Sequence, residues 1–334
     1  MNKQNDQIKK ESFLRTIPKY FLLIITLVIA VVFEILQPKF FTLNNIMDII
    51  RTTSVVGLMA LGMTLVMATG EMNLAVGAEA TIAAAVVGKF LDSKEPRSLI
   101  LAIFIGLLAS LVVGVLNSFF VVKIGVPSFI GTIAMTTFIN GFIKIITQNQ
   151  YMYSKHWPKS YTFLGQTRLG GVIPMPALIF ILISILLIIL MDHTKFGRYV
   201  NAVGDSPTAC KNVGINAKLI VICCYLLCSL ISGFDGIIAS SQVKSVSPTL
   251  GADALMSAMA ATMLGGTFLR PGQYSIQGTI VAALFLTIIQ NGAISIGAPN
   301  FIKDLIQGIT LIVSVGVIAM THKGGLPSVT FNNN

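Results

Sequence analysis

The sequence predicts an all-α, polytopic membrane protein, a helical bundle in which most of the outer surface faces lipid. Hydrophobic residues make up 54% of the 334 positions and charged residues only 11%, and the mean hydropathy is +0.82. A soluble domain carries about 25% charged residues, so this chain cannot cover its surface with ions. The net charge of +10 fits the excess of Lys and Arg in cytoplasmic loops. No basic run interleaved with aromatics indicates nucleic-acid binding.

Long apolar runs recur along the chain, each close to the length of about 20 helical residues that a bilayer core requires. They predict about ten transmembrane helices, near 20–37, 46–69, 72–91, 98–121, 127–147, 174–191, 217–239, 253–269, 275–297 and 302–320. Gly and polar residues interrupt the second, third and eighth of these. The runs form one transmembrane domain over 20–320, between an N-terminal tail at 1–19 and a C-terminal tail at 321–334.

The charge of the N-terminal tail predicts the orientation, because basic flanks stay in the cytoplasm. Its basic residues are Lys3, Lys9, Lys10, Arg15 and Lys19. The first apolar run has no small-residue cleavage site after it, so we expect an uncleaved span. Ten spans then leave both tails and the polar break at 192–216 in the cytoplasm, and the break at 148–173 outside. The aromatic residues of the outer break suit an interfacial belt: Tyr151, Tyr153, Trp157 and Tyr161.

The cytoplasmic break contains a short helix with clear start and stop signals. Asp205 or Ser206 is a good N-cap, Pro207 occupies the first helical position, and Gly214 supplies the stop. These residues predict a helix of about two turns, which is marginal in isolation. Either a partner surface in the cytoplasm or the ends of the protein's own spans must hold it.

Two regions, 66–85 and 263–283, place Gly and polar residues between apolar stretches. A broken membrane helix is tolerated only where protein or a water-filled cavity shields its backbone, and in transporters such breaks point to the substrate path or a gate. A tight helical hairpin that only packs closely is the alternative for each region.

Glu79 and Asp235 are the ionisable residues most enclosed by apolar sequence. A charge at mid-bilayer costs roughly 2.5–3.5 kcal/mol on insertion scales, so both are functional candidates. Each can bind solute hydroxyls, couple transport to protons, or lie near a span end or beside a basic neighbour. The neutral polar residues within spans either bridge helices or line a pathway: Asn117, Asn140, Gln290 and Asn291.

No residue cluster predicts a metal, a cofactor or an enzyme active site in this chain. Cys223, Cys224 and Cys228 share one apolar run without a second ligand cluster, which indicates buried hydrophobic positions. Three histidines lie far apart in loops, and neither H-E-x-x-H nor G-x-S-x-G occurs.

The polar break, "TKFGRYVNAVGDSPTACKNVGIN" (194–216), resembles the cytoplasmic coupling segment of ribose/xylose-type permeases of bacterial ABC importers, in the branched-chain amino acid/ribose permease superfamily. The matching positions are Thr194, Phe196, Gly197, Arg198, Ala202, Gly204, Ala209, Gly214 and Ile215. Similar stretches follow the family at 60–78, 117–134 and 263–292, so the resemblance covers nearly the whole chain in order.

The resemblance implies a permease subunit of the bacterial inner membrane that forms a homodimer in the lipid bilayer. A separate ATP-binding cassette ATPase, carrying ATP and Mg, would drive alternating access, and an extracellular or periplasmic binding protein would deliver the solute. The solute would be a small polar one, most simply a ribose-like monosaccharide. Consistent with a separate ATPase, the chain contains no G-x-x-x-x-G-K-[ST] motif. The residues implied for coupling are Gly204, Asp205, Ser206, Pro207, Ala209, Lys211 and Gly214.

The chain departs from the family in the first broken region, where the usual "GIDLSVG" reads "EMNLAVG" (71–77). The loop that follows residue 265 also differs, reading "GTFLRPGQYS". The residues expected in the pathway or gate are Glu71, Asn73, Glu79, Asn117, Asp235, Gln290 and Asn291. Open alternatives are an ion- or proton-coupled secondary transporter using Glu79 or Asp235, an ABC permease for a nucleoside or furanosyl signalling molecule, and a scaffold or receptor without transport.

Overall fold

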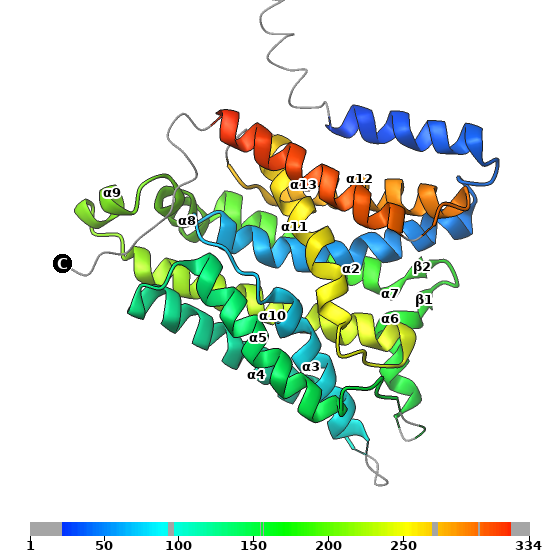
Figure 1. Ribbon diagram of the computed structural model, residues 1–334, viewed down its shortest axis with the longest axis horizontal. Helices are drawn as coiled ribbons and strands as arrows, with labels where there is room; N and C mark the ends of the chain where they lie inside the picture. The colour runs from blue at the N-terminus through cyan, green and yellow to red at the C-terminus, as the bar shows by residue number, and fades with distance from the viewer. Residues whose placement is uncertain are drawn as a thin grey trace, which may run out of the picture.

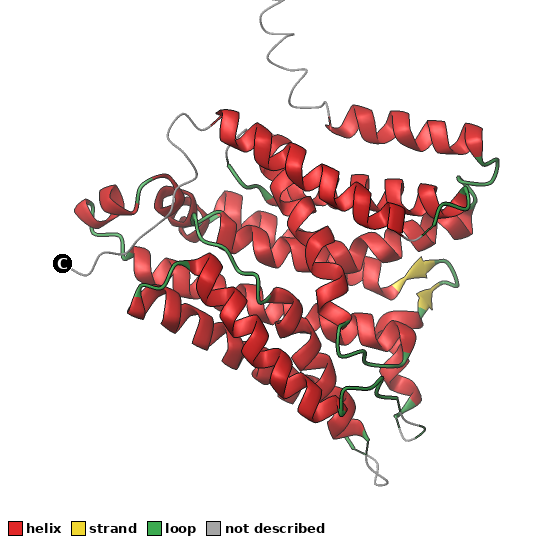
Figure 2. Ribbon diagram, viewed as in Figure 1, coloured by secondary structure: helices red, strands yellow, loops and turns green. Residues whose placement is uncertain are grey.

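The structure is a computed structural model that describes residues 22–92, 97–153, 155, 157–268, 273–299 and 301–321. Helices make up most of this part of the chain, as Figure 2 shows, which confirms the all-α membrane fold class. The tail at 1–19 and all of the C-terminal tail except Thr321 lie outside the described residues.

A helix lies at each range that the apolar runs predict. These helices are Leu22–Leu36, α2 (Leu43–Met67), α3 (Val76–Leu91), α4 (Leu99–Ser118), α5 (Ser128–Thr147), α7 (Met175–Ile188), α10 (Ala217–Val243), α11 (Leu250–Phe268), α12 (Ile276–Ser295) and α13 (Phe301–Thr321). Two π-helical turns, η1 (Phe119–Ile124) and η3 (Ile189–His193), extend α4 and α7.

Within the described residues, six helices are long and apolar enough to cross a membrane, and the helix at Leu22–Leu36 is apolar but shorter. The six are Leu43–Met67, Leu99–Ile124, Ser128–Thr147, Met175–His193, Ala217–Val243 and Ile276–Ser295. The count of ten crossings stays a prediction, because α3, α11 and α13 do not meet this measure on their own.

The two ends of the molecule carry different structures (Figure 1). At one end lie α8 (Lys195–Asp205) and α9 (Pro207–Asn212), both within the predicted cytoplasmic break. At the other end, a short antiparallel hairpin pairs two strands of two residues each, β1 (Arg168–Leu169) and β2 (Ile173–Pro174). It lies next to η2 (Lys159–Thr162) and α6 (Phe163–Gln166). The guanidinium of Arg168 lies 3.3 Å from the Asp48 carboxylate, which fastens this hairpin to the start of α2.

The segment at 148–173, called the outer segment below, contains the four aromatic residues assigned to an interfacial belt. Two of them are buried. Trp157 is 2% exposed and its indole N–H donates to the Gly88 carbonyl oxygen at 2.9 Å. Tyr161 is fully buried, its hydroxyl lies 2.6 Å from the Ser240 hydroxyl, and burial raises its pKa to about 12. The belt prediction is therefore wrong for these two residues, because a composition cannot distinguish a lipid-facing aromatic from one that packs under a loop. Tyr151 and Tyr153 are exposed, as a belt requires.

Helix α10 is central and packs against α2, α3 and α4. Small residues allow this close approach, because a Cβ on Gly236 would overlap the Ala80 carbonyl oxygen of α3. The Ser110 hydroxyl of α4 donates to the Ser229 carbonyl oxygen of α10 at 2.6 Å. The region at 263–283 forms a close pair of helices in its described part, since a Cβ on Gly265 of α11 would lie 2.6 Å from the Thr279 amide nitrogen of α12. The tight-hairpin alternative fits this region.

Candidate transport pathway and coupling segment

The chain between α2 and α3 turns back into the molecule. Helix α2 has 25 residues, about 37 Å, enough to cross the bilayer core, and the residue after it, Ala68, touches α8. At its far end, α3 touches the outer segment at Gly88, which receives the Trp157 hydrogen bond. The rise from Gly77 to Gly88 is about 16 Å, half of a bilayer core of about 30 Å. Helix α3 therefore starts near mid-membrane, and Figure 1 shows the segment before it running inward.

Helix α11 also starts inside the molecule, and it meets the start of α3. Val246 pairs with Met152 of the outer segment, and the chain then descends to Leu250, where α11 begins. A Cβ on Gly77 would lie 2.6 Å from the Gly251 carbonyl oxygen, so the two backbones touch. The Gly251 amide donates to the Thr81 hydroxyl at 2.8 Å. The break before α3 matches the sequence prediction, whereas the one before α11 was not predicted.

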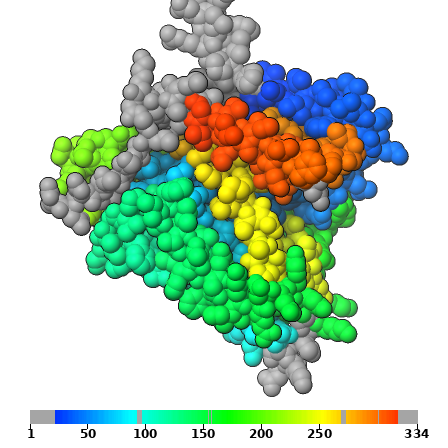
Figure 3. Space-filling model, viewed as in Figure 1, coloured from blue at the N-terminus to red at the C-terminus, as the bar shows by residue number. Residues whose placement is uncertain are grey.

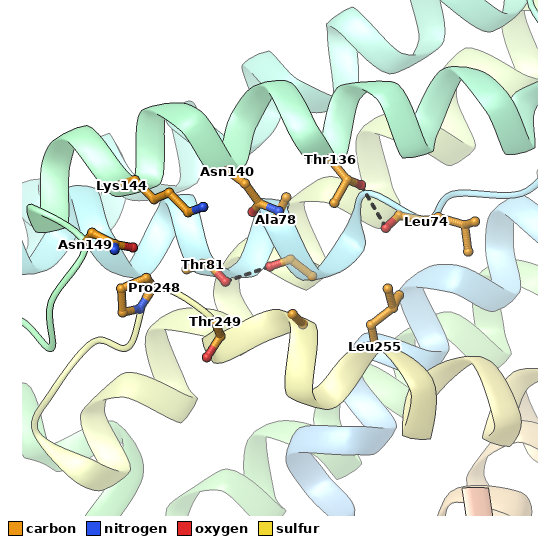
Figure 4. Close-up of a pocket in the computed structure, with 12 residues that line it drawn as sticks. Leu74, Ala78, Thr81, Thr136, Asn140, Lys144, Asn149, Pro248, Thr249 and Leu255 are labelled. Carbon is orange, nitrogen blue, oxygen red and sulfur yellow. Dashed lines mark hydrogen bonds between the residues drawn. The ribbon is translucent and has the colours of Figure 1, made fainter. Parts of the chain in front are cut away.

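A cavity of about 190 Å³ lies where these two helix starts face α5 (Figure 4). Its lining residues are Leu74, Gly77, Ala78, Thr81, Thr136, Asn140, Lys144, Asn149, Pro248, Thr249, Ala252 and Leu255. In the space-filling view, α5 and α11 lie on the same face of the molecule (Figure 3). The lining combines hydroxyl, amide and ammonium groups, which makes the cavity a candidate part of a polar path through the protein.

A polar stripe on α5 holds the broken segment. The hydroxyls of Ser128 and Thr132 accept from the amides of Met72 and Leu74, each at 3.1 Å. The Thr136 hydroxyl donates to the Leu74 carbonyl oxygen at 3.1 Å. Residues four apart lie on one helix face, so α5 supplies the hydrogen bonds that the extended backbone would otherwise lack.

Three of the predicted pathway residues form one buried cluster beside this segment. The Glu79 carboxyl group accepts from the side-chain amides of Asn73 and Asn117, each at 3.1 Å. The Asn73 side-chain oxygen accepts from the Ala75 amide at 3.0 Å, which fixes the turn just before α3. All three side chains are at most 1% exposed. Of the three roles left open for Glu79, a buried pairing with neighbours fits best, although the partners are amides rather than basic groups.

The other predicted pathway residues are dispersed. Asp235 is 1% exposed on α10, and both of its carboxyl oxygens lack a hydrogen-bond partner among the described residues. Glu71 is 3% exposed in the broken segment, next to the Met72 carbonyl oxygen that accepts from Tyr225 at 2.8 Å. Gln290 is 6% exposed on α12, and the half-buried Asn291 lies one residue further on. In the described part of the chain, none of these four makes a hydrogen bond to the Glu79 cluster.

The short helix of the cytoplasmic break is present as predicted. Helix α9 starts at Pro207, the Ser206 side chain accepts from the Ala209 amide at 3.3 Å, and Gly214 has a φ of +77°. Ser206 rather than Asp205 is therefore the N-cap. Cys210 faces inward with 3% exposure, and burial, with a contribution from Asp205, raises the pKa of its thiol. The outward side chains are Asp205, Thr208, Ala209, Lys211, Asn212 and Val213.

Helix α8, which precedes α9, was not predicted from the sequence. The Thr194 hydroxyl caps it by accepting from the Phe196 amide at 3.1 Å, and Val200 and Val203 are fully buried. The apolar residues at 196, 200 and 203 have helical spacing, so the sequence does contain a pattern that indicates α8. This pattern is weaker than the start and stop signals of α9 at Pro207 and Gly214. A Cβ on Gly204 would overlap the Ala68 carbonyl oxygen, so α8 touches the end of α2 directly.

The cavity contains polar residues that sequence reasoning left out of the site, chiefly Thr81, Thr136, Lys144 and Thr249. The spacing of Thr136, Asn140 and Lys144 at every fourth position of one apolar run would have found the α5 stripe. Thr249 carries no such signal, because only the folded chain brings it against α5.

The family model described as "Branched-chain amino acid transport system / permease component" matches residues 45–315. The chain is 31% identical to the ribose import permease protein RbsC of Escherichia coli (strain K12), covering 88% of this chain and 91% of that protein. It is 30% identical to RbsC of Bacillus subtilis (strain 168), over 86% and 88% of the two chains. It is 28% identical to the fructose import permease protein FrcC of Rhizobium meliloti, over 92% and 87%.

No solved structure matches the chain. The family match and the relatives both cover the broken segment, the α5 stripe and the coupling segment, so the similarity includes every element of the candidate site. This protein therefore belongs to the branched-chain amino acid transport system / permease component family.

Proposed function

We propose that the chain is the membrane-spanning subunit of an ATP-driven importer for a small polar solute, most simply a ribose-like monosaccharide. Two copies of the chain form the pathway, an extracellular or periplasmic binding protein delivers the solute, and a separate ATPase drives alternating access through α9. The relatives named as ribose and fructose import permeases support the solute class. The chain's membership of a permease family and its apolar helices support a place in the bacterial inner membrane.

The exposed helix α9 carries this proposal. Its outward face presents Ala209, Lys211 and Val213, the last with 73% of its surface exposed. A capped helix of six residues is too short to be stable alone, and its buried Cys210 anchors it to the protein. The structure thus provides both the anchor and a free face for a partner.

A continuous set of contacts leads from α9 to the cavity. Helix α9 follows α8 directly, α8 touches Ala68 through Gly204, and residues 69–75 lead from there to the start of α3. Leu74 of this segment lines the cavity. Packed contacts of this kind transmit a displacement only if the connected segment has two discrete arrangements. In alternating access, these are the inward-facing and outward-facing arrangements of residues 69–75.

A proton- or ion-coupled transporter is the alternative. Asp235 favours it, because both of its buried carboxyl oxygens lack a hydrogen-bond partner in the described part of the chain. Glu79 does not favour it, because its carboxyl group already holds two amide donors that fix the broken segment.

The experiment is a tagged purification from native membranes in mild detergent, with Ala209→Asp as the test variant and Lys159→Asp as the control. Both positions are exposed, at opposite ends of the molecule. We expect a Walker-motif ATPase to co-purify with the wild-type chain and the control in near-equal amount, and to be lost from Ala209→Asp. Absence of an ATPase from the wild-type preparation, together with uptake that collapses with the ion gradient, would establish the alternative.

A further inference from the structure

We propose that the cavity between α3, α5 and the start of α11 is the solute-binding site of the pathway, with Asn140 and Lys144 as its specificity-determining residues. The site takes a small polyhydroxylated solute without positive charge, whose oxygens accept hydrogen bonds from these two side chains. This inference rests on the proposed transport function and adds the position and chemistry of recognition.

The polar stripe on α5 continues from Ser128 to Lys144 at every fourth residue, and its last two side chains have no partner among the described residues. Its first three members, Ser128, Thr132 and Thr136, all bond to the backbone of residues 72–74. The side chains of the next two, Asn140 and Lys144, make no hydrogen bond or ion pair to any other described residue, and both residues line the cavity. Figure 4 shows them projecting from α5 toward α3. Asn140 is partly exposed and Lys144 is exposed, so both side chains are accessible to a solute that enters the cavity.

The charge of the cavity lining also favours an uncharged or anionic solute. None of the lining residues, all of them in the described part of the chain, carries a carboxylate. Lys144 supplies three donors and no acceptor, and an amide supplies two donors. Such a lining favours acceptor oxygens, whereas a cationic solute would be repelled by the Lys144 ammonium group at short range.

The hydroxyl groups of the cavity already make hydrogen bonds within the protein. Thr81 donates to the Gly77 carbonyl oxygen and accepts from the Gly251 amide, each at 2.8 Å. Thr249 lies 3.0 Å from the Ser247 hydroxyl. These residues shape the site and retain some accepting capacity, whereas the side chains of Asn140, Lys144 and Asn149 donate to no other described residue, and the first two are the ones that continue the polar face of α5.

The size of the cavity sets the size of the solute. A volume of about 190 Å³ is below the roughly 300–1,000 Å³ of pockets for drug-sized ligands. A monosaccharide is suited to such a space and an oligosaccharide is not. The buried cluster of Asn73, Glu79 and Asn117 offers no comparable space, because its groups bond to one another.

The binding test is solute protection of an Ala252→Cys variant reconstituted in nanodiscs with its partner ATPase, because Ala252 lines the cavity and is exposed but supplies no side-chain donor. The label is a polar maleimide, and the wild-type chain gives the background from its four native thiols, of which Cys210 is buried with a raised pKa. The solutes are D-ribose, its aldonic acid ribonate, and the cationic amino sugar glucosamine. We expect the first two to slow labelling and glucosamine to have no effect at the same concentration. Absence of labelling, or equal labelling with all three solutes, would overturn the inference.

The transport test compares Lys144→Met and Asn140→Ala with two matched controls. Thr137→Val changes the neighbouring exposed position on α5, and Lys123→Met removes an exposed lysine near the Phe119 ring, 5.7 Å from its centroid. We expect each test variant to lower solute uptake about tenfold, the loss expected for one hydrogen bond to a charged or amide donor, and the controls to keep wild-type uptake.

Co-purification of the ATPase shows that each variant is folded and separates the two proposals. If the wild-type chain imports ribose with its ATPase and both test variants do the same, the site assignment is wrong while the transport function stands. If the wild-type chain neither binds an ATPase nor imports any of the solutes, the proposed function is wrong.

Discussion

Glu79 illustrates what a carboxyl group inside a membrane protein does when no basic residue is near. Its oxygens accept from Asn73 and Asn117, and Asn73 also fixes the turn before α3 by accepting from the Ala75 amide. The group therefore organises the broken segment at the point where an ordinary helix would continue. Asp235 differs from Glu79, because both of its carboxyl oxygens lack a hydrogen-bond donor among the described residues.

Replacing Glu79 by Ala should leave two buried amide donors unsatisfied. We expect the free energy of unfolding to fall by about 1–3 kcal/mol, and Glu79→Gln to lose less because it keeps one acceptor oxygen. Thermal unfolding of the purified protein measures this, with the exposed Asp253→Asn as the control. Equal melting temperatures for Glu79→Ala and the wild-type chain would show that the cluster does not support the fold.

At the scale of elements, the breaks before α3 and α11 and the pair α8–α9 decide what this bundle can do. The breaks let two helices start inside the protein, with Gly77 against Gly251, and leave the cavity between them and α5. Helix α8 then fixes the exposed α9 to the end of α2. Both contacts, Gly77 with Gly251 and Gly204 with Ala68, require glycine because a Cβ atom would overlap the neighbouring backbone.

Replacing Gly204 by Leu should separate α8 from Ala68, because the added side chain would overlap the Ala68 carbonyl oxygen. Overpacking of this kind costs about 1–3 kcal/mol. We expect uptake to fall about tenfold while the ATPase still binds the exposed face of α9. The control is Lys195→Leu, at an exposed position of α8. Normal uptake by Gly204→Leu would exclude this contact from the coupling route.

At the scale of the whole molecule, the two ends differ as the two sides of a membrane do. One end presents the coupling segment, and the other presents the β1–β2 hairpin and the outer segment with Trp157 and Tyr161 (Figure 1). Helix α7 and its extension η3 connect these ends over Met175–His193, which is long and apolar enough to cross.

This arrangement predicts opposite accessibility for Tyr151 and Lys211, both exposed side chains. We expect Tyr151→Cys to react with an impermeant thiol reagent from outside, and Lys211→Cys to react only in inside-out vesicles. The positive charge of the N-terminal tail predicts this orientation. Reaction of both variants from the same side would contradict the predicted topology.

The sequence by itself determined the fold class, the positions of the ten helices, the broken segment before α3 and the capped helix at Pro207, because hydropathy, span length and capping are local properties. It also placed Asn73, Glu79 and Asn117 among the residues of interest. Only the tertiary structure showed that these three bond to one another, that Trp157 and Tyr161 are buried, and that α11 starts against Gly77. Burial and unpaired donors such as Lys144 depend on contacts between residues far apart in the chain, which no local pattern encodes.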